Sequence, residues 1–365
     1  MGSSYLPLEL RPYPGRVATV SRMVLATVLT MLLVMVFQLP NGFLAVFYAF
    51  AVPRKDLRTT VRNGIAMALA NMAGIAVSLT GIALFIDYLL LHFLFVLFAF
   101  FVAFFLTRIL ANYAAALGFG VIVVAAASVD VIWSLPNPLR PDPGSIFWSG
   151  FGMMLGALVT LAIEWLAGSP MASDRHETQQ RLLVPDAFAN PEYLIFALKG
   201  TLAAAICYLV WTALAWPGSG VCTVTCLLAA PPTIRGSSRQ KLLTHLAGLL
   251  FGGVVCGIGS QIWVLPTIDS IFGFTLAFAV VSAIAAWAST ASPRFSYFGG
   301  QMALAYYLTI FQGFGVNPSL AMSRDRLMGI LLGILTMYLV YDVGPPWLRS
   351  VLPWGTPIRS RLRST

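Results

Sequence analysis

Twelve apolar stretches, separated by short polar segments, constrain this chain more than any other feature of its sequence. Most are about 20 residues long, which is the length an α-helix needs to cross the hydrocarbon core of a bilayer. Hydrophobic residues make up 59% of the 365 residues and charged residues only 10%, against roughly 25% charged in a soluble domain. This excludes an ordinary soluble enzyme, a disordered chain and a nucleic-acid-binding domain. The pattern predicts an all-α polytopic membrane protein with about 12 transmembrane helices.

The stretches fall into two groups of six. Residues 1–167 form a first predicted membrane repeat, 168–191 a cytoplasmic linker, 192–345 a second membrane repeat and 346–365 a basic cytoplasmic tail. The stretches 42–52 and 219–231 are shorter than the ~17 residues of a full crossing. We therefore expect these two either to extend into flanking residues or to be re-entrant.

The basic residues predict the orientation of the chain. Lys and Arg concentrate in cytoplasmic loops of membrane proteins. With a cytoplasmic N-terminus and twelve crossings, 19 of the 22 basic residues lie on or beside the cytoplasmic side, and only Arg140, Arg324 and Arg326 lie outside. Both termini are therefore predicted to be cytoplasmic. The net charge of +9 follows from this topology and does not indicate nucleic-acid binding.

The two halves match each other at a nearly constant offset, which predicts a tandem repeat. At 177 residues, Pro40 falls on Pro217, and Gly152 and Gly156 fall on Gly329 and Gly333. Because each half holds six crossings, the halves share one orientation, and we expect a substrate path between them. The glycine pairs are expected to let helices approach closely. Other matched pairs, at offsets of 177 to 186, are Arg22 with Lys199, Arg58 with Arg235, Arg62 with Arg239, Glu164 with Asp342, Asp87 with Asp269 and Arg108 with Arg294.

Ionisable residues inside predicted spans are candidate functional residues, because charge within a membrane is costly. Arg22 and Lys199 either extend toward the lipid headgroups or bind the anionic group of a substrate. Gln301, Tyr306 and Tyr307 either offer a polar and aromatic face to a ring-bearing ligand or serve as core packing.

Further candidates concern coupling and gating. Glu164 and Asp342 can bind and release a proton during a transport cycle, or form fixed ion pairs. His92 is a candidate proton relay, or a satisfied polar side chain. The remaining candidates are Arg108 and Arg294 as a gate or anion path, and Arg324, Asp325 and Arg326 as an adaptor-docking or exit site or a local charge cluster.

Motifs for enzymatic chemistry are absent from the sequence. It contains no nucleotide-binding, serine-hydrolase, zinc-protease or calcium-loop pattern. We therefore expect no catalytic residues, no cofactor and no metal site, and uphill transport would have to use an ion gradient or a partner. The four cysteines are expected to be small buried apolar residues; they are Cys207, Cys222, Cys226 and Cys256.

Several strings resemble a known transporter family in their order and spacing. They are Arg11-Pro-Tyr-Pro-Gly-Arg16, Phe37-Gln-Leu-Pro40, Asn190-Pro-Glu192, Ala197-Leu-Lys-Gly-Thr-Leu-Ala-Ala204, Cys207-Tyr208, Trp216-Pro-Gly218, Thr223-Val-Thr-Cys226, Ala286-Trp287, Ser292-Pro-Arg-Phe-Ser-Tyr297 and Arg324-Asp-Arg-Leu-Met-Gly-Ile-Leu-Leu-Gly333. Together they resemble the fusaric acid resistance (FUSC) family, and most closely its MdtO-type inner-membrane efflux components. The family usually carries a large cytosolic domain between the two membrane halves, where this chain has only 168–191.

The resemblance implies secondary-active export of aromatic carboxylic acids or amphipathic drugs across a bacterial inner membrane, coupled to protons. It also implies a periplasmic adaptor and an outer-membrane channel as partners. Two alternatives stay open. One is an anion channel that resembles the plant malate channels, because rings of basic residues select anions. The other is a subunit that assembles an efflux complex without transporting. Either kind of protein could form a homo-oligomer.

Overall fold

A computed structural model describes residues 14–52, 57–127, 143–168, 182–214, 216, 220–230 and 238–343. Each of the twelve apolar stretches forms a helix in it, so the all-α prediction is confirmed for these residues. The helices of the first group are α2 Arg16–Val36, α3 Gly42–Ala51, α4 Leu57–Phe85, α5 Leu89–Ile109, α6 Tyr113–Ala127 and α7 Pro143–Leu166. Those of the second group are α8 Pro191–Leu214, α9 Gly220–Ala229, α10 Ser238–Gly248, α11 Ile271–Ser289, α12 Pro293–Ile310 and α13 Leu320–Tyr338.

Four short helical elements and a small hairpin complete the second group. The helix begun by α10 continues as π-helical η1 (Leu249–Ile258) and η2 (Ser260–Val264) and ends in η3 (Leu265–Thr267). Between α12 and α13 lies a hairpin of β1 (Phe311–Gln312) and antiparallel β2 (Gly315–Val316). The turn η4 (Leu339–Val343) extends α13.

Seven helical segments of the described chain are long and apolar enough to cross a membrane. In contrast, α3 and α9 have ten residues each, which is too short for a full crossing. Both short stretches predicted from the sequence are therefore short helices in the structure. The count of twelve crossings stays a prediction.

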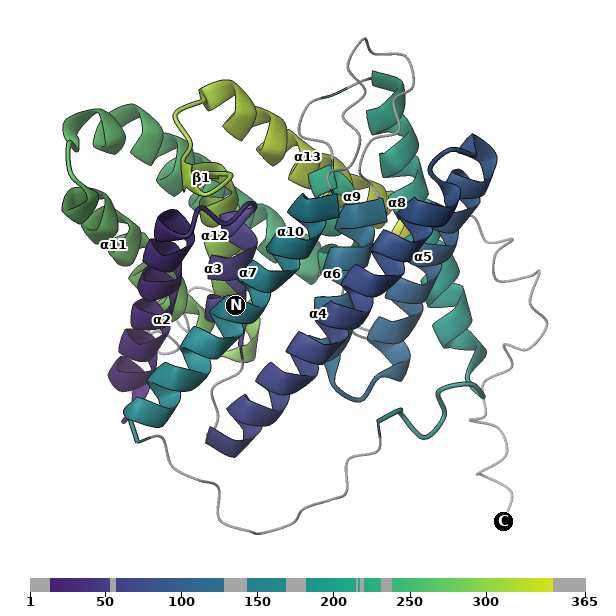
Figure 1. The fold of residues 1–365 in the computed structure, drawn as a ribbon, viewed down its shortest axis with the longest axis horizontal. Coiled ribbons are helices and arrows are strands. Elements are labelled where there is room, and N and C mark those ends of the chain that lie inside the picture. Colours follow the sequence, from purple (N-terminus) through teal and green to yellow (C-terminus); the bar gives the residue numbers. More distant parts are fainter. Residues whose placement is uncertain are drawn as a thin grey trace, which may run out of the picture.

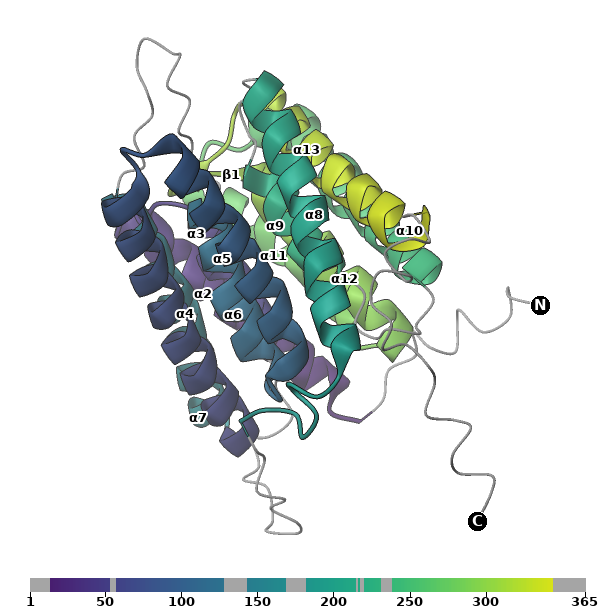
Figure 2. The ribbon, with the colours of Figure 1, turned by 90° about the vertical axis from the view of Figure 1, so that its right-hand side faces the viewer.

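The helices pack in the same pattern within each group. In the first group α3 packs against α2 and α7, α4 against α6 and α7, and α5 against α6. In the second group α9 packs against α8 and α13, η1 against α12 and α13, and α11 against α12. Figure 2 shows the purple-to-blue first group and the green-to-yellow second group side by side.

The contacts between the groups are reciprocal. On one side α5 packs against α8 and α6 against α9, and on the other α11 packs against α2 and α12 against α3. In Figure 1 the second set lies on the left and the α5–α8 contact on the right. The fourth and fifth helices of each group therefore contact the first and second helices of the other.

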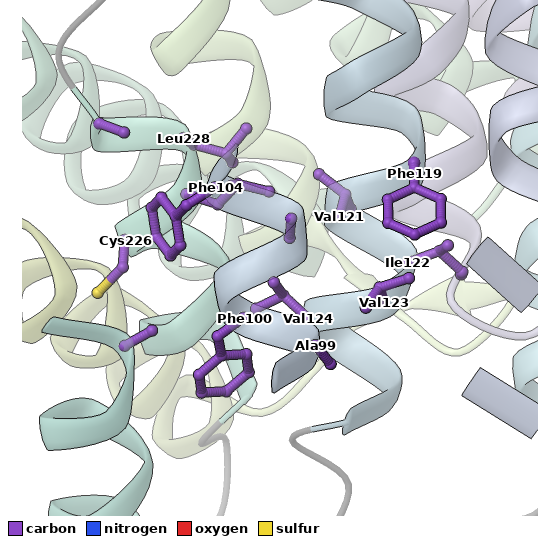
Figure 3. Packing of buried hydrophobic residues seen from close by; sticks show 14 of the residues in the cluster. Ala99, Phe100, Phe104, Phe119, Val121, Ile122, Val123, Val124, Cys226 and Leu228 are labelled. Carbon is purple, nitrogen blue, oxygen red and sulfur yellow. The ribbon is translucent and has the colours of Figure 1, made fainter. Parts of the chain in front are cut away.

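Two apolar cores hold the groups together. The larger one joins α5 and α6 to α8 and α9, and Figure 3 shows Phe100 and Phe104 of α5 beside Cys226 and Leu228 of α9. The second joins α2 and α3 to α11 and α12. Because each core draws residues from both groups, the interface between the groups is packed like a protein interior. Away from these cores, large apolar side chains are exposed, as expected where helices face lipid; examples are Leu69, Phe98, Trp165, Trp263 and Phe272.

Glycines set the closest helix contacts, as the repeated glycine pairs predicted. A Cβ atom at Gly156 of α7 would overlap the carbonyl oxygen of Ala45 in α3. A Cβ atom at Gly333 of α13 would lie 2.6 Å from the carbonyl oxygen of Cys222 in α9. The short helix of each group is thus packed directly against the backbone of that group's last helix.

Replacement of Gly156 by Ala is expected to destabilise the protein by about 1–3 kcal/mol, the usual cost of overpacking. The reason is that neither the Ala45 carbonyl nor the α7 backbone can move without separating α3 from α7. The measurement is thermal unfolding of the purified protein in detergent. Gly152→Ala is the matched control, because its Cβ would be 3.4 Å from the nearest atom, an ordinary contact. Equal unfolding midpoints for the two variants would contradict this account.

Candidate functional site

A cavity of about 320 Å³ lies between the two helix groups. Helices α3, α6 and α7 of the first group and α9, α12 and α13 of the second line it. Its size is near the lower end of the ~300–1,000 Å³ typical of small-molecule sites. The wall is mostly apolar, with a few polar side chains, which is also typical of such sites. The cavity is therefore the candidate functional site of the described residues.

Many of the lining residues occupy matching positions in the two groups. Residue pairs separated by the 177-residue offset of the sequence face the cavity together, from α3 and α9 and from α7 and α13. Two further pairs, from α6 and α12, are separated by 182 residues. The cavity wall is thus built from corresponding parts of both groups. These pairs are Phe43 with Gly220, Leu44 with Val221, Phe47 with Val224, Tyr48 with Thr225, Ser149 with Arg326, Ile122 with Leu304 and Ala126 with Leu308.

The polar part of the wall is unevenly distributed. Asn41, at the start of α3, donates a hydrogen bond from Nδ2 to Ser149 Oγ at 2.7 Å. The hydroxyl of Tyr48 is buried and has no hydrogen-bond partner within the part of the chain that the structure describes. Arg326 is the one charged residue among the described residues that line the cavity.

The guanidinium of Arg326 is anchored at the end of α12. Its Nη1 donates hydrogen bonds to the carbonyl oxygens of Leu308, at 2.6 Å, and Phe311. These carbonyls lie in the last turn of α12 and just beyond it, where the helix cannot satisfy them itself. The neighbouring hairpin is joined to the other group, because Gly42 N at the start of α3 donates to Gly313 O at 2.8 Å.

The three charged residues predicted to form one outer cluster separate into two environments. Arg324 is exposed and pairs with Asp325, with 2.8 Å between Nη2 and Oδ1. Arg326 faces the cavity instead. One helical turn thus places one cation at the surface, paired with the buried Asp325, and another at the cavity.

Arg22 and Glu164 form an ion pair outside the cavity. Arg22 Nε lies 3.1 Å from Glu164 Oε2, and it also donates to Oε1 at 3.2 Å. The Glu164 side chain is 3% exposed and that of Arg22 is 23% exposed. The pair joins α2 to α7 within the first group, so the structure contains the fixed ion pair that the sequence left open as an alternative.

Lys199 has an aromatic neighbour. Its Nζ lies 5.7 Å from the ring centroid of Tyr341, and the Tyr341 hydroxyl donates to Phe196 O at 2.7 Å. Asp342, the predicted counterpart of Glu164, belongs to η4, but its side chain is outside the described part.

The aromatic face predicted on α12 is packed into the core. Tyr307 is fully buried; its hydroxyl donates to Ser282 Oγ at 3.0 Å, and its ring stacks 5.1 Å from that of Phe278. Tyr306 is buried in the same core between the groups. Gln301 is buried where α12 meets α10. A Cβ atom added at Gly248 of α10 would lie 2.6 Å from the Cβ atom of Gln301. None of the three predicted ligand-binding residues lines the cavity.

The remaining candidates lie at helix contacts. His92 of α5 is 2% exposed, and neither ring nitrogen has a hydrogen-bond partner among the described residues. The Arg108 guanidinium lies over the ring of Phe196, 3.7 Å from its centroid, where α5 meets α8. The side chain of Arg294 is outside the described part, as are most of the predicted linker (169–181) and the whole basic tail.

Arg16 is a buried residue whose role the sequence did not reveal. Its Nε donates to Thr290 Oγ1 at 3.2 Å, its Nη2 donates to Trp287 O, and its guanidinium lies 4.1 Å from the Trp287 ring centroid. It thereby holds α2 against α11 across the group interface. The cysteine prediction is confirmed for Cys207, Cys222 and Cys226, which are buried.

Apart from Arg326, the lining residues of the cavity also escaped prediction, although a signal for them existed. Most of them are apolar, and in a chain of this composition an apolar residue of the cavity wall cannot be told from one of the core. Extending the 177-residue offset from charged residues and glycines to every residue of α3 and α9 would have paired them.

Loss of the Glu164 carboxylate is expected to destabilise the protein, because it leaves the Arg22 guanidinium without its ion-pair partner. We expect Glu164→Leu to cost about 2–3 kcal/mol, less than the ~3–5 kcal/mol for a fully buried pair, since Arg22 is 23% exposed. The double variant Arg22→Met/Glu164→Leu should recover most of this loss. Detergent unfolding of both variants measures the coupling, and additive losses would rule out an energetically important pair.

Comparison with known proteins gives relatives for part of the chain. A stretch of 160 residues, 44% of this chain, is 35% identical to the multidrug resistance protein MdtO of Shigella flexneri and to the proteins of the same name from Escherichia coli O157:H7 and Escherichia coli strain K12. No family model and no solved structure matches. The matched stretch covers 23% of the length of these relatives. The chain is therefore a homologue of MdtO over this stretch, and a membrane protein by its apolar helices.

Proposed function

We propose that this chain is an efflux transporter of the bacterial inner membrane, an MdtO-type member of the FUSC family that exports aromatic carboxylic acids or amphipathic drugs. The observation that carries the proposal is the cavity between the two helix groups, which both groups line at matching positions. The name of the relatives, multidrug resistance protein, supports export as the activity. A substrate site at the interface of two halves is the usual arrangement in secondary transporters.

The proposal includes a tandem repeat of two six-helix units, related by an axis along the membrane normal. It is supported by the equal packing within the groups and by the reciprocal contacts between them. In a two-fold symmetric interface, a surface of one unit contacts the corresponding surface of the other in the same reciprocal way. Gly156 and Gly333, at matching positions, support it further by packing α7 on α3 and α13 on α9.

The cavity would form the outer part of the transport path. Ala126, Ser149 and Leu308 line it near helix ends that the predicted orientation places outside. Arg22 and Lys199 would lie toward the cytoplasmic end, where they stay candidates for attracting an anion. Arg324, which is exposed and pairs with the buried Asp325, would face a periplasmic adaptor.

Proton coupling would use the buried carboxylate of Glu164. Protonation removes its charge and so weakens its attraction to Arg22, which would release α7 from α2. Asp342 is the second carboxylate proposed for this role, and His92 the proposed relay.

Uptake into proteoliposomes that contain the purified chain tests transport and coupling together. With an imposed pH gradient, we expect a labelled aromatic carboxylate to accumulate above equilibrium, and a protonophore to abolish that accumulation. Glu164→Gln should still let the substrate equilibrate but should prevent uphill accumulation. Equilibration unaffected by the protonophore would favour the anion channel instead, and no movement would favour an assembly subunit.

Filling the cavity is expected to block transport. Val224→Trp places an indole in the cavity wall of α9, and we expect at least tenfold slower uptake with the unfolding temperature little changed. Leu69→Trp, on an exposed position of α4, is the matched control and should transport at the normal rate. Normal uptake by Val224→Trp would place the path elsewhere.

A further inference from the structure

We infer that Arg326 is the specificity-determining residue of the cavity, and that it binds the anionic group of the ligand on one side of the repeat axis only. The ligand would then be an amphipathic monoanion held in a single orientation. This inference rests on the proposed function, since it names the group by which the same cavity recognises its ligand. Two observations carry it.

The first is the hydrogen bonding of the guanidinium. An arginine has five N–H donors, two of them on Nη1. Both contacts of Arg326 to the protein within the described chain use Nη1. Nε and Nη2 form the other edge of the guanidinium, and this edge can bind a carboxylate through two parallel hydrogen bonds. The two carbonyl oxygens fix the guanidinium in place without neutralising its charge.

The second observation is the residue at the matching position. Arg326 of α13 corresponds to Ser149 of α7 at the 177-residue offset, and both line the cavity. Ser149 accepts a hydrogen bond from Asn41. One half of the wall therefore has a cation where the other has a neutral hydroxyl. A ligand with a single negative charge is bound more tightly in one of its two orientations.

A structural role alone is the competing explanation, in which Arg326 only satisfies the last carbonyls of α12. The two explanations predict a different dependence of binding affinity on the charge of the ligand. A capping arginine stabilises the protein whatever the ligand, whereas a binding arginine discriminates between an acid and its neutral analogue. Equilibrium binding of 2-naphthoate and of 2-naphthamide to the purified full chain in detergent separates them.

We expect Arg326→Ser to weaken 2-naphthoate binding about 10- to 100-fold, the loss of a charge-assisted hydrogen bond, and to change 2-naphthamide binding less than threefold. Arg324→Ser is the matched control, since it removes an exposed cation two residues away on the same helix. Its binding of both compounds should equal that of the unaltered chain. Unchanged naphthoate binding by Arg326→Ser, or an equal loss for both compounds, would overturn the inference.

Arg326→Gln keeps the test decisive if Arg326→Ser unfolds, because its neutral amide can still donate to the carbonyls at the end of α12; it should bind 2-naphthoate as weakly as expected for Arg326→Ser. A swap of the two matching residues is the second test. In Ser149→Arg/Arg326→Ser the cation moves to the corresponding place in the first group, so the preference for naphthoate over naphthamide should return. A swapped protein that folds but does not distinguish acid from amide would count against the inference.

The binding and transport measurements fail independently. If the unaltered chain binds naphthoate through Arg326 but moves nothing across a membrane, the proposed function falls and the ligand site stands. If the chain transports aromatic acids and Arg326→Ser transports them with unchanged KM, the exporter stands and the assignment of Arg326 falls.

Discussion

The close contact of each short helix with the last helix of its own group is the constraint on which the site depends. Helix α3 lies against the backbone of α7 at Gly156, and α9 against that of α13 at Gly333. Ten residues are too few to cross a bilayer, so these helices gain their stability from tertiary contacts. Because one face of each short helix packs against the last helix of its group, the opposite face is free to line the cavity, which lies between α3 and α9. Side chains in place of the glycines would push both short helices into that space.

Aromatic rings and carbonyl oxygens contact several cations in the described part of the chain. Arg16 lies over Trp287 and Arg108 over Phe196, at the two reciprocal contacts between the groups. Such cation–π interactions contribute to the stability of these contacts. Arg326 uses carbonyl oxygens in a similar way. Glu164 differs, since it pairs directly with Arg22 and so joins α7 to α2.

Sequence reasoning predicted the helices well and the site poorly. Apolar length and turn residues were enough to predict all twelve helices, including the short α3 and α9, because helix formation in a membrane depends on local composition. The π-helical course of η1 was not predicted. There Gly252 and Gly253 let the helix approach Met302 and Leu327 closely, a contact that depends on distant residues. Tyr306 and Tyr307 were chosen for their chemistry but are buried in the core, whereas Tyr48 and Arg326 line the cavity because of how the groups pack.

The proposed tandem repeat gives the matching positions of Ser149 and Arg326 an evolutionary consequence. A homodimer of six-helix chains would carry the same residue at both positions, so an arginine there would appear twice within a space of about 320 Å³. Two like charges so close repel each other strongly in a medium of low dielectric constant. Joining the halves in one gene removes this restriction, because each copy can then mutate alone. A fused chain can therefore acquire a polarised binding site that selection could never reach in a symmetric ancestor.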